Sequence, residues 1–250
     1  MRSPRERSEK KVHCDPAVLQ RIRSRFVEWG VPESHAVKFL EHYSVVSFRK
    51  GSLICKRGSP SDLLYWVCDG LVDILYPLDS GGKMSFRLSG PGDVFGPLSL
   101  LDASGHLTHA FEVRARTDCR VAFVTNERVR SSLIKLDPAT LVELLKRVLV
   151  SWAEHAQHST NFLAMGFQRR LQSIIADLAS RFGVDEPHGV LLPINLGHQD
   201  LAAMIGSSRP VVTQLLAKMR RAGKIDQRGK YYILITHRKN RESAFDLQDS

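Results

Sequence analysis

The sequence predicts an α+β chain in which an antiparallel β domain and a long helix precede a winged helix-turn-helix. Three observations support this fold class. Residues 45–125 contain short apolar runs separated by glycines, which is typical of an antiparallel sandwich, roll or barrel. Residues 138–165 have an unbroken helical repeat, and residues 198–235 contain two short helical patterns followed by two strand-like runs.

The composition is that of a globular protein. Of 250 residues, 43% are hydrophobic and 25% charged, and no apolar run approaches the roughly 18 residues that span a bilayer. The first residues, MRSPRERSEKK, lack the apolar segment of a secretory signal. Neither a disulfide framework nor a metal site is expected, because the cysteines lie far apart without a CxxC pair. They are Cys14, Cys55, Cys68 and Cys119. We therefore expect a cytoplasmic, reduced protein with no membrane partner.

The net charge of +10 is concentrated at the ends of the chain. Lys and Arg outnumber Asp and Glu by eight to four in residues 1–30 and by thirteen to eight in residues 166–250, but only by fifteen to fourteen between them. A near-neutral middle between basic ends is typical of a polyanion-binding protein with a separate regulatory or structural domain. Basic ends that only increase solubility would give the same pattern.

The N-terminal part is predicted to be a disordered basic tail over residues 1–15, followed by helices at residues 18–30 and 32–43. The strand-like runs that come next are VVSF, SLIC, LLYWVC, LVDILY, SFRL, FEVRA and RVAFV. Their length and glycine punctuation predict antiparallel pairing.

A long helix is predicted from Asp137 and Pro138, a favourable N-cap and first-turn pair, to about Met165. One face of this helix repeats with 4-3 spacing, the a/d rhythm of a coiled coil. The seam consists of Leu141, Leu145, Val148, Trp152, His155, Ser159 and Phe162. We interpret it as a dimer seam, because a monomer rarely exposes such large side chains along a helix. A core helix with no partner is the alternative.

The last part of the chain is helical and basic. An amphipathic helix over residues 169–183 ends at Gly183, and residues 185–189 are predicted to be a loop. The runs KIDQ and KYYILI, split by Arg228 and Gly229, form the predicted wing.

The segment IGSSRPVVTQLLAKM joins the two short helices and begins the second. Gly206 lies in the turn, Ser208 is the predicted N-cap, and Arg209 starts the helix. Pro210 then occupies the first turn, where its missing N–H costs little. An apolar face is buried, and Arg209, Thr213 and Gln214 point outward.

That outward set matches the chemistry of base reading. Arginine can contact guanine O6 and N7, and glutamine can contact adenine N6 and N7, in the major groove. Residues near the DNA backbone are expected to be His198, Gln199, Ser208, Lys218, Arg228 and Lys230. A solvated helix face in a domain that binds protein remains the alternative.

The segment HQDLAAMIGSSRPVVTQLLAKMRRAGKIDQRGKYYILI resembles the winged helix of the CRP/FNR superfamily of bacterial transcription regulators. VVSFRKGSLICKRGSPSDLLYWVCDGLVDIL resembles the β-roll of that family, GPGDVFGPLSLL its phosphate-binding cassette, and residues 138–165 its dimerisation helix. The resemblance implies a homodimer on a palindromic operator, effector sensing in a cyclic-nucleotide-binding-like β-roll, and RNA polymerase as a possible partner. The expected domains are the tail (1–15), the β-roll with its leading helices (16–130), the dimerisation helix (131–165) and the winged helix-turn-helix (166–250).

The cassette departs from the cyclic-nucleotide-binding members of the family. Pro97 stands where those members have a glutamate for the ribose, and His109 and Ala110 stand where they have an arginine and a hydroxyl residue for the phosphate. Proline and alanine provide no cationic, hydrogen-bonding cradle for a phosphate. The expected effector pocket comprises Gly96, Pro97, Leu98, His109, Ala110, His155 and Ala156. We therefore predict no tight binding of cyclic AMP, and the effector is left unidentified.

Other sensory groups of the family match no better. Iron–sulfur members have three clustered cysteines before the β-roll, whereas only Cys14 lies there. The remaining cysteines lie in apolar runs and are expected to be buried. Ligation of haem or a metal by scattered histidines is a weaker alternative. The candidate ligands are His106, His109, His155 and His158. No cofactor is predicted.

The recognition helix also departs from the family pattern, because Pro210 and Gln214 replace a glutamate and an arginine found in many members. Arg209 is expected to specify a guanine, with Thr213 and Gln214 altering the adjoining preference. The leading interpretation is a dimeric, sequence-specific transcription regulator. A ligand-binding or protein-interaction module that does not read DNA is the alternative. An enzyme is not expected, because no Walker loop, GxSxG or HExxH motif is present.

Overall fold

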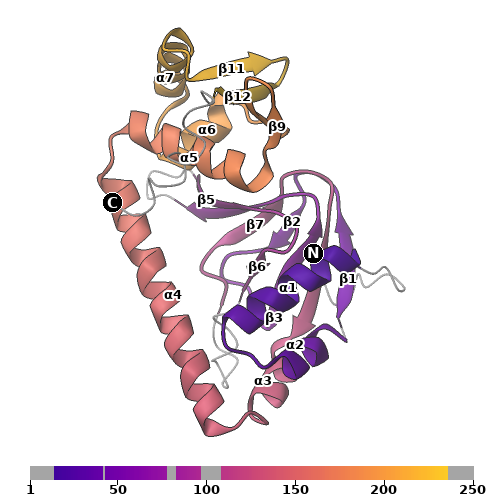
Figure 1. Cartoon of the computed structure of the whole chain (residues 1–250). Helices are drawn as coiled ribbons and strands as arrows, with labels where there is room; N and C mark the ends of the chain where they lie inside the picture. The colour runs from indigo at the N-terminus through magenta and orange to yellow at the C-terminus, as the bar shows by residue number, and fades with distance from the viewer. Residues whose placement is uncertain (1–13, 42, 78–82, 97–107, 236–250) are drawn as a thin grey trace. The chain divides into compact units, whose positions relative to one another are not determined.

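The computed structural model describes residues 14–41, 43–77, 83–96 and 108–235 (Figure 1). The chain forms two compact units, Met1–Gln157 and His158–Ser250. The first contains the β domain and the second contains the helix-turn-helix, so the predicted α+β class is confirmed. Within the described ranges, no helix is long and apolar enough to cross a membrane.

Two four-stranded antiparallel sheets form the β domain. Their strands are β1 (Ser44–Phe48), β2 (Leu53–Cys55), β3 (Leu63–Asp69), β4 (Val72–Pro77), β5 (Lys83–Ser89), β6 (Val94–Phe95), β7 (Glu112–Ala115) and β8 (Cys119–Thr125). One sheet has the order β1-β8-β3-β6, and the other has the order β2-β7-β4-β5. Because neighbours in a sheet are often distant in sequence, most of the pairing is long-range.

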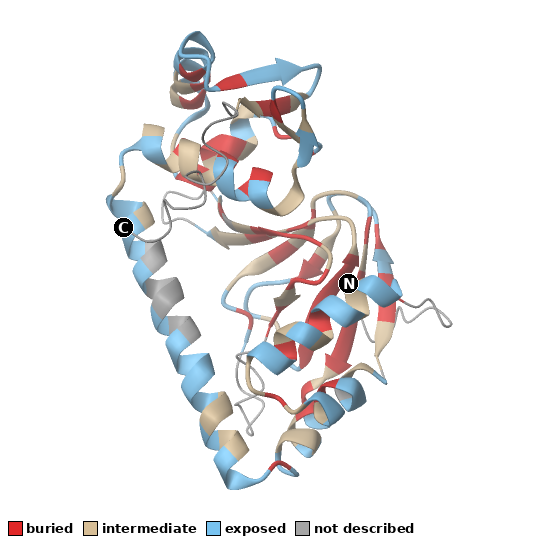
Figure 2. Cartoon of the chain, in the orientation of Figure 1, coloured by how far each residue is buried: buried red, intermediate tan, exposed pale blue. Residues whose placement is uncertain are grey.

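Strand β3 is buried on both faces, as Figure 2 shows for the inner part of the β domain. Side chains alternate along a strand. Tyr65 and Val67 therefore face the core between the sheets, while Leu64 and Trp66 face a second core beneath the helices. The continuous apolar run LLYWVC is explained by this two-sided burial.

Three short helices cover the outer face of this sheet and contribute to the second core. They are α1 (Pro16–Glu28), α2 (Glu33–Leu40) and α3 (Asn126–Leu133). The first two were predicted, but α3 was not, because its exposed polar residues give only a weak apolar repeat. Asp15 caps α1 by accepting a hydrogen bond from the Ala17 N–H at 2.7 Å. Residues 1–13 of the predicted tail lie outside the described residues.

Cys14 and Cys68 form a disulfide, so the expectation of no disulfide was wrong. Their Cα atoms lie 5.1 Å apart, although 54 residues separate them in the sequence. Packing of α1 over β3 brings them together, and linear spacing carries no sign of that contact. Cys55 and Cys119 are free and buried, as predicted, and burial raises the pKa of each thiol to about 12.

The long helix α4 (Pro138–Ala164) begins and ends as predicted. Asp137 caps it by accepting a hydrogen bond from the Thr140 N–H at 3.0 Å. Its first half is held to the β domain through Arg147, whose guanidinium donates to the Glu28 carbonyl at 2.9 Å, and through Leu144 in the helix-covered core. Figure 2 shows exposed positions along most of the helix.

The second unit packs three helices on a four-stranded antiparallel sheet of order β11-β12-β10-β9. Its elements are α5 (Phe167–Phe182), β9 (Val184–Glu186), β10 (Gly189–Leu192), α6 (His198–Ile205), α7 (Arg209–Arg221), β11 (Ile225–Arg228) and β12 (Tyr231–Ile235). The two predicted helices of the helix-turn-helix, α6 and α7, and the predicted wing hairpin of β11 and β12 are confirmed.

The predicted loop at residues 185–189 was wrong in part, because strands β9 and β10 occupy most of it. The short strand β9 is mostly exposed and shows no apolar alternation that would have indicated it. Gly189 permits the pairing of β10 with β12: a Cβ atom there would lie 2.1 Å from the Leu234 carbonyl oxygen.

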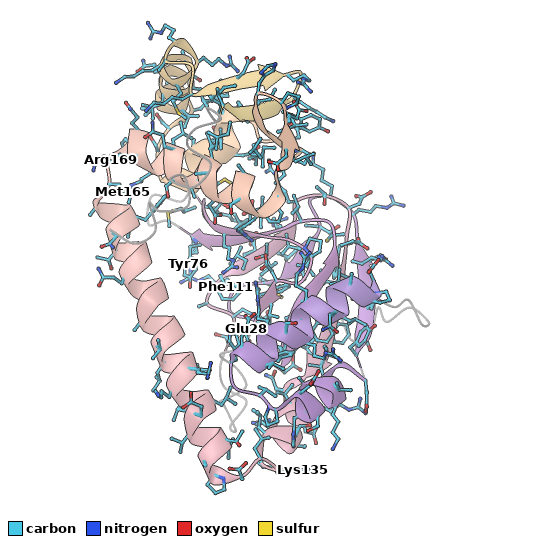
Figure 3. All side chains as sticks on the ribbon, viewed as in Figure 1. Glu28, Tyr76, Phe111, Lys135, Met165 and Arg169 are labelled. Carbon is cyan, nitrogen blue, oxygen red and sulfur yellow. A yellow bond between two sulfur atoms is a disulfide. The ribbon has the colours of Figure 1, made fainter. Side chains whose placement is uncertain are left out.

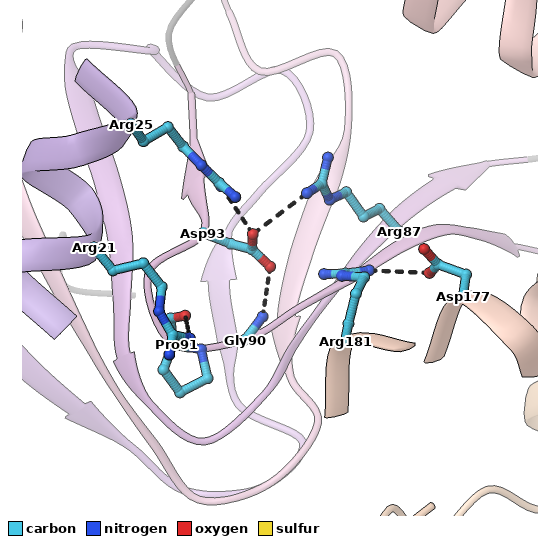
Figure 4. Close-up of polar contacts among 8 residues, drawn as sticks. All are labelled: Arg21, Arg25, Arg87, Gly90, Pro91, Asp93, Asp177 and Arg181. Atoms are coloured by element: carbon cyan, nitrogen blue, oxygen red, sulfur yellow. Dashed lines mark hydrogen bonds and ion pairs between the residues drawn. The ribbon is translucent and has the colours of Figure 1, made fainter. Parts of the chain in front are cut away.

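Asp93 ties three parts of the first unit together immediately before β6 (Figure 4). Its buried carboxylate accepts hydrogen bonds from Arg25 of α1 at 3.0 Å, Arg87 of β5 at 3.3 Å and the Gly90 N–H at 2.9 Å. The contact links a covering helix, the second sheet and the turn that leads into the predicted cassette.

Replacing Asp93 with Ala should lower the free energy of unfolding of the β domain by about 2 to 3 kcal/mol. The loss is smaller than for a fully buried ion pair, because both arginines are more than a third exposed. Glu33→Ala, which removes an exposed ion pair with Arg23, should cost less than about 1 kcal/mol. Urea unfolding compares the two variants, and equal losses would contradict the assigned role of Asp93.

Candidate nucleic-acid interface and effector pocket

A glycine with a left-handed backbone conformation forms the turn between the two helices of the helix-turn-helix. Gly206 ends α6 with φ of 67°, a conformation that glycine adopts without a Cβ penalty. Ser208 then occupies the N-cap of α7, and Pro210 lies in its first turn, as predicted. Leu201, Ile205, Val212, Leu216 and Met219 are buried beneath these helices. Both helices are therefore fixed from below while the other face of α7 stays open.

The three expected base-reading residues lie on the exposed side of α7. Arg209, Thr213 and Gln214 are all exposed, at helical spacings of four and one residues. The Thr213 hydroxyl donates to the Arg209 carbonyl oxygen at 2.9 Å, and it lies 2.7 Å from the His198 Nδ1 atom of α6. The structure thus brings a predicted backbone-contacting residue into contact with a predicted base-reading residue.

The other expected backbone-contacting residues lie around this face. Gln199, Ser208 and Lys218 are exposed on or next to α6 and α7, and Lys230 lies over the Tyr231 ring at 5.3 Å. Arg228 differs, because its two terminal nitrogens each donate to a Glu186 carboxylate oxygen at 2.8 Å. Sequence reasoning missed Glu186, which belongs to the strand β9 that was not predicted.

The basic end of α7 was also left out of the predicted interface. Arg220, Arg221 and Lys224 are exposed at or just beyond the last turn, and Arg220 hydrogen-bonds to the Gln227 side chain on the wing. The run KMRRAGK is the signal that could have indicated them. Basic side chains at a helix C-terminus also stabilise the helix dipole, so this run supports the fold as well as the positive charge of the face.

The described part of the expected effector pocket converges on Tyr65 of β3. Gly96 adopts φ of 85°, and a Cβ atom there would lie 3.2 Å from the Tyr65 ring. His109 is buried, with its ring centroid 6.1 Å from those of both Tyr65 and Phe111. Tyr65 also stacks on Phe95 at 5.0 Å. The sequence-distant cassette strand and His109 therefore meet at one cluster of aromatic rings.

Aromatic side chains continue from this cluster to the second sheet. The Tyr76 and Phe111 rings lie 6.1 Å apart, and Figure 3 shows both side chains together at that sheet. Ala110 is exposed. Pro97, Leu98 and His106 lie outside the described residues. His155 and Ala156 lie in α4, but their side chains, like those of Trp152, His158 and Ser159, are outside what the structure describes.

The charge state of His109 follows from its burial. Desolvation lowers the pKa of the imidazole below its usual value, and the nearby Asp62 offsets this only in part. The Ser61 hydroxyl lies 3.4 Å from Nδ1. Because the neutral ring is favoured near pH 7, His109 does not supply the positive charge that a phosphate needs.

Comparison with known proteins identifies the family. Residues 45–135 match the cyclic nucleotide-binding domain, and residues 169–240 match the Crp-like helix-turn-helix domain. The global nitrogen regulator of Synechococcus elongatus is 31% identical over 181 residues, covering 70% of this chain and 78% of that protein. This chain belongs to the CRP/FNR superfamily.

Two further CRP/FNR proteins extend the likeness. A CRP-like cAMP-activated global transcriptional regulator of Mycobacterium tuberculosis is 27% identical over 209 residues, covering 82% of this chain and 90% of that protein. A CRP/FNR transcriptional regulator of Thermus thermophilus has the same fold, with a TM-score of 0.60 and 24% identity over 82% of this chain and 98% of that chain. The chain is therefore a transcription regulator of this superfamily with a DNA-binding helix-turn-helix domain.

No group of three His, Cys, Asp or Glu side chains in the described part of this CRP/FNR chain is placed to hold a metal ion. His109, one of the scattered histidines considered as a ligand, instead packs among aromatic rings.

The buried His109 should make the β domain less stable in mild acid. Because its pKa is lowered by folding, the unfolded chain binds the proton first, so the free energy of unfolding should fall as the pH drops below about 6.5. Urea unfolding at pH 7.5 and pH 5.5 should show this fall in the wild type and a smaller fall in His109→Asn. His188→Asn, at an exposed turn, is the control. An unchanged fall in His109→Asn would exclude this histidine as its source.

Proposed function

We propose that this CRP/FNR chain acts as a homodimer that reads a palindromic operator in double-stranded DNA. The exposed row of Arg209, Thr213 and Gln214 on α7 carries the proposal, because a recognition helix reads bases through side chains on its outer face. Helix α5 packs against both α6 and α7, and β11 packs against α7, so the row has support from the rest of the unit. A protein-interaction module of the same fold is the alternative outcome.

The proposed backbone contacts surround this row. His198 and Gln199 lie at the start of α6, Ser208 at the N-cap of α7, and Lys218 on its outer side. Arg228 and Lys230 belong to the wing hairpin. Their contacts to phosphate would position α7 without reading sequence. We further propose that the protein acts in the cytoplasm, with RNA polymerase as its partner in transcription.

The regulator is also proposed to act independently of cyclic AMP. The position expected to hold a phosphate-binding arginine is occupied by His109, which is buried among aromatic rings and favours its neutral form. The adjacent position is Ala110, which has no hydrogen-bonding side chain. Neither group compensates the charge of a cyclic phosphate. The proposal leaves two modes of action, control by a different small molecule and activity without an effector.

Selection of operators from random duplex DNA by the purified protein tests both proposals. A two-fold palindrome recovered equally with and without cyclic AMP is the expected result. Recovery only with cyclic AMP would overturn the interpretation that His109 and Ala110 cannot bind a cyclic phosphate. Failure to enrich any sequence, together with equal affinity for all duplexes, would favour the interaction module.

Replacing Arg209 with Ala should weaken binding to the selected operator by about 1 to 3 kcal/mol and relax the preference at one base pair. Lys218→Ala is the matched control, because loss of a phosphate contact should weaken binding to all sequences and reduce the salt slope by about 1. Titrations against the operator and a scrambled duplex at several salt concentrations distinguish these effects. Equal losses on both duplexes would assign Arg209 to the backbone.

The exposed face of α4 supports the proposed dimer. Leu145 is 51% exposed, Val148 42% and Leu149 54% in the single chain, so the alternative of a buried core helix does not describe them. Apolar side chains in a row along a helix are typical of a subunit interface. Arg147 and Leu144 bind the β domain from a neighbouring side of the helix, and the seam residues Leu145 and Val148 remain exposed in the single chain.

Replacing Leu145 with Glu should convert the dimer into a monomer, because a charge would be buried within the apolar seam. Sedimentation equilibrium measures the mass, and Lys146→Ala, at an exposed neighbouring position, is expected to leave the dimer intact. Circular dichroism of both variants checks that α4 remains helical. A folded Leu145→Glu protein that still sediments as a dimer would place the interface elsewhere.

A further inference from the structure

The Thr213 hydroxyl is occupied by two hydrogen-bond partners within the protein. It lies 2.9 Å from the Arg209 carbonyl oxygen and 2.7 Å from the His198 Nδ1 atom. A carbonyl oxygen can only accept, so the single hydroxyl proton is directed to Arg209. Nδ1 must then be the protonated ring nitrogen and donate to the Thr213 oxygen. One arrangement of protons satisfies both contacts.

This arrangement uses the only hydrogen that the Thr213 side chain can donate. The hydroxyl has given its proton to the Arg209 carbonyl and accepted one from Nδ1, so it has no donor left for a base edge, one acceptor lone pair remains, and the methyl group is the apolar part of an exposed side chain. Arg209 and Gln214, on the same exposed side of α7, keep side chains whose N–H groups suit purine acceptors. Thr213 therefore differs from its neighbours in presenting an apolar group within a polar row.

Thymine is the base that presents a matching apolar group in the major groove, its C5-methyl, and a threonine methyl is a known type of partner for it. We propose that Thr213 determines a preference for thymine in the operator half-site through contact between its Cγ2 methyl and the thymine methyl. This inference rests on the proposed function, because it requires α7 to enter the major groove. It identifies which atom of Thr213 reads the base.

Deoxyuridine substitution isolates the methyl group on the DNA side. Each thymine of the selected operator is replaced in turn by deoxyuridine, which keeps every hydrogen-bonding group and removes only the C5-methyl. The wild-type protein should lose about fourfold in affinity per half-site at one thymine position, the effect of one buried methyl-sized group. Binding is measured at fixed salt with the full-length protein.

Two variants isolate the methyl group on the protein side. Thr213→Ser keeps the hydroxyl and should bind the thymine and uracil operators equally at that position. Thr213→Val keeps the Cγ2 methyl, replaces the hydroxyl with a second methyl group and loses both hydrogen bonds. It should retain the preference for thymine. The ratio of the two affinities is the readout, so a general loss of affinity in either variant does not affect the comparison.

The outcomes separate this inference from the proposed function. If a palindrome is selected but the wild type binds its thymine and uracil forms equally at every position, the inference about Thr213 is overturned. The proposed function as a DNA-reading regulator is then retained. A half-site without thymine, or a Thr213→Ser protein with the wild-type preference, overturns the inference about Thr213 as well. A preference kept by Ser and lost by Val would overturn it too, because the thymine methyl would then be read without the Thr213 methyl group. Failure to select any operator removes both proposals together.

Discussion

Arg170 holds together the part of the second unit on which DNA reading depends. Its guanidinium donates to the carbonyl oxygens of Leu163 at 2.5 Å, Met165 at 2.9 Å and Ile205 at 3.0 Å. The last carbonyl groups of a helix lack partners within the helix and carry partial negative charge. One cation therefore satisfies the ends of both α4 and α6. Its guanidinium also lies over the rings of Phe162 and Phe167, at 5.7 and 5.3 Å.

This contact has a mechanical consequence for regulation. Ile205 is the last residue of α6 and immediately precedes Gly206, so the turn that starts α7 is bonded to the last turn of α4. A shift of that last turn must either carry α6 with it or break hydrogen bonds to a charged group, each worth about 1.5 to 3 kcal/mol. If an effector is to change the recognition helices of such a regulator, a link of this kind is required, since an effector acts only through states that it binds differently.

The sequence predicted most elements but few of the contacts that join them. Short apolar runs and glycine punctuation located every described strand of the β domain except β6, and Asp137 with Pro138 located the start of α4, because these signals are local. Pairings between distant segments have no such local signal in the sequence. Cys14 meets Cys68 only because α1 packs over β3, and His109 and Gly96 each approach Tyr65 only because the fold brings distant segments to that ring. The contacts of Arg170, Glu186 and Asp93 were missed for the same reason. The sequence does not distinguish a charged side chain that is solvated by water from one that binds another part of the protein.

The pair between Arg228 and Glu186 shows how such a contact changes the interpretation of charge. Both terminal nitrogens of Arg228 already bind carboxylate oxygens. Arg228 on β11 and Glu186 on β9, 42 positions apart in the sequence, belong to one sheet of order β11-β12-β10-β9. A DNA phosphate must then share the guanidinium with Glu186 or displace it, and the carboxylate repels that phosphate. The salt slope of binding counts the phosphates that cations neutralise. Arg228 should therefore contribute less to that slope than a wing residue with no such partner, and Lys230, whose ammonium lies over Tyr231, is expected to be the stronger of the two proposed backbone contacts of the wing.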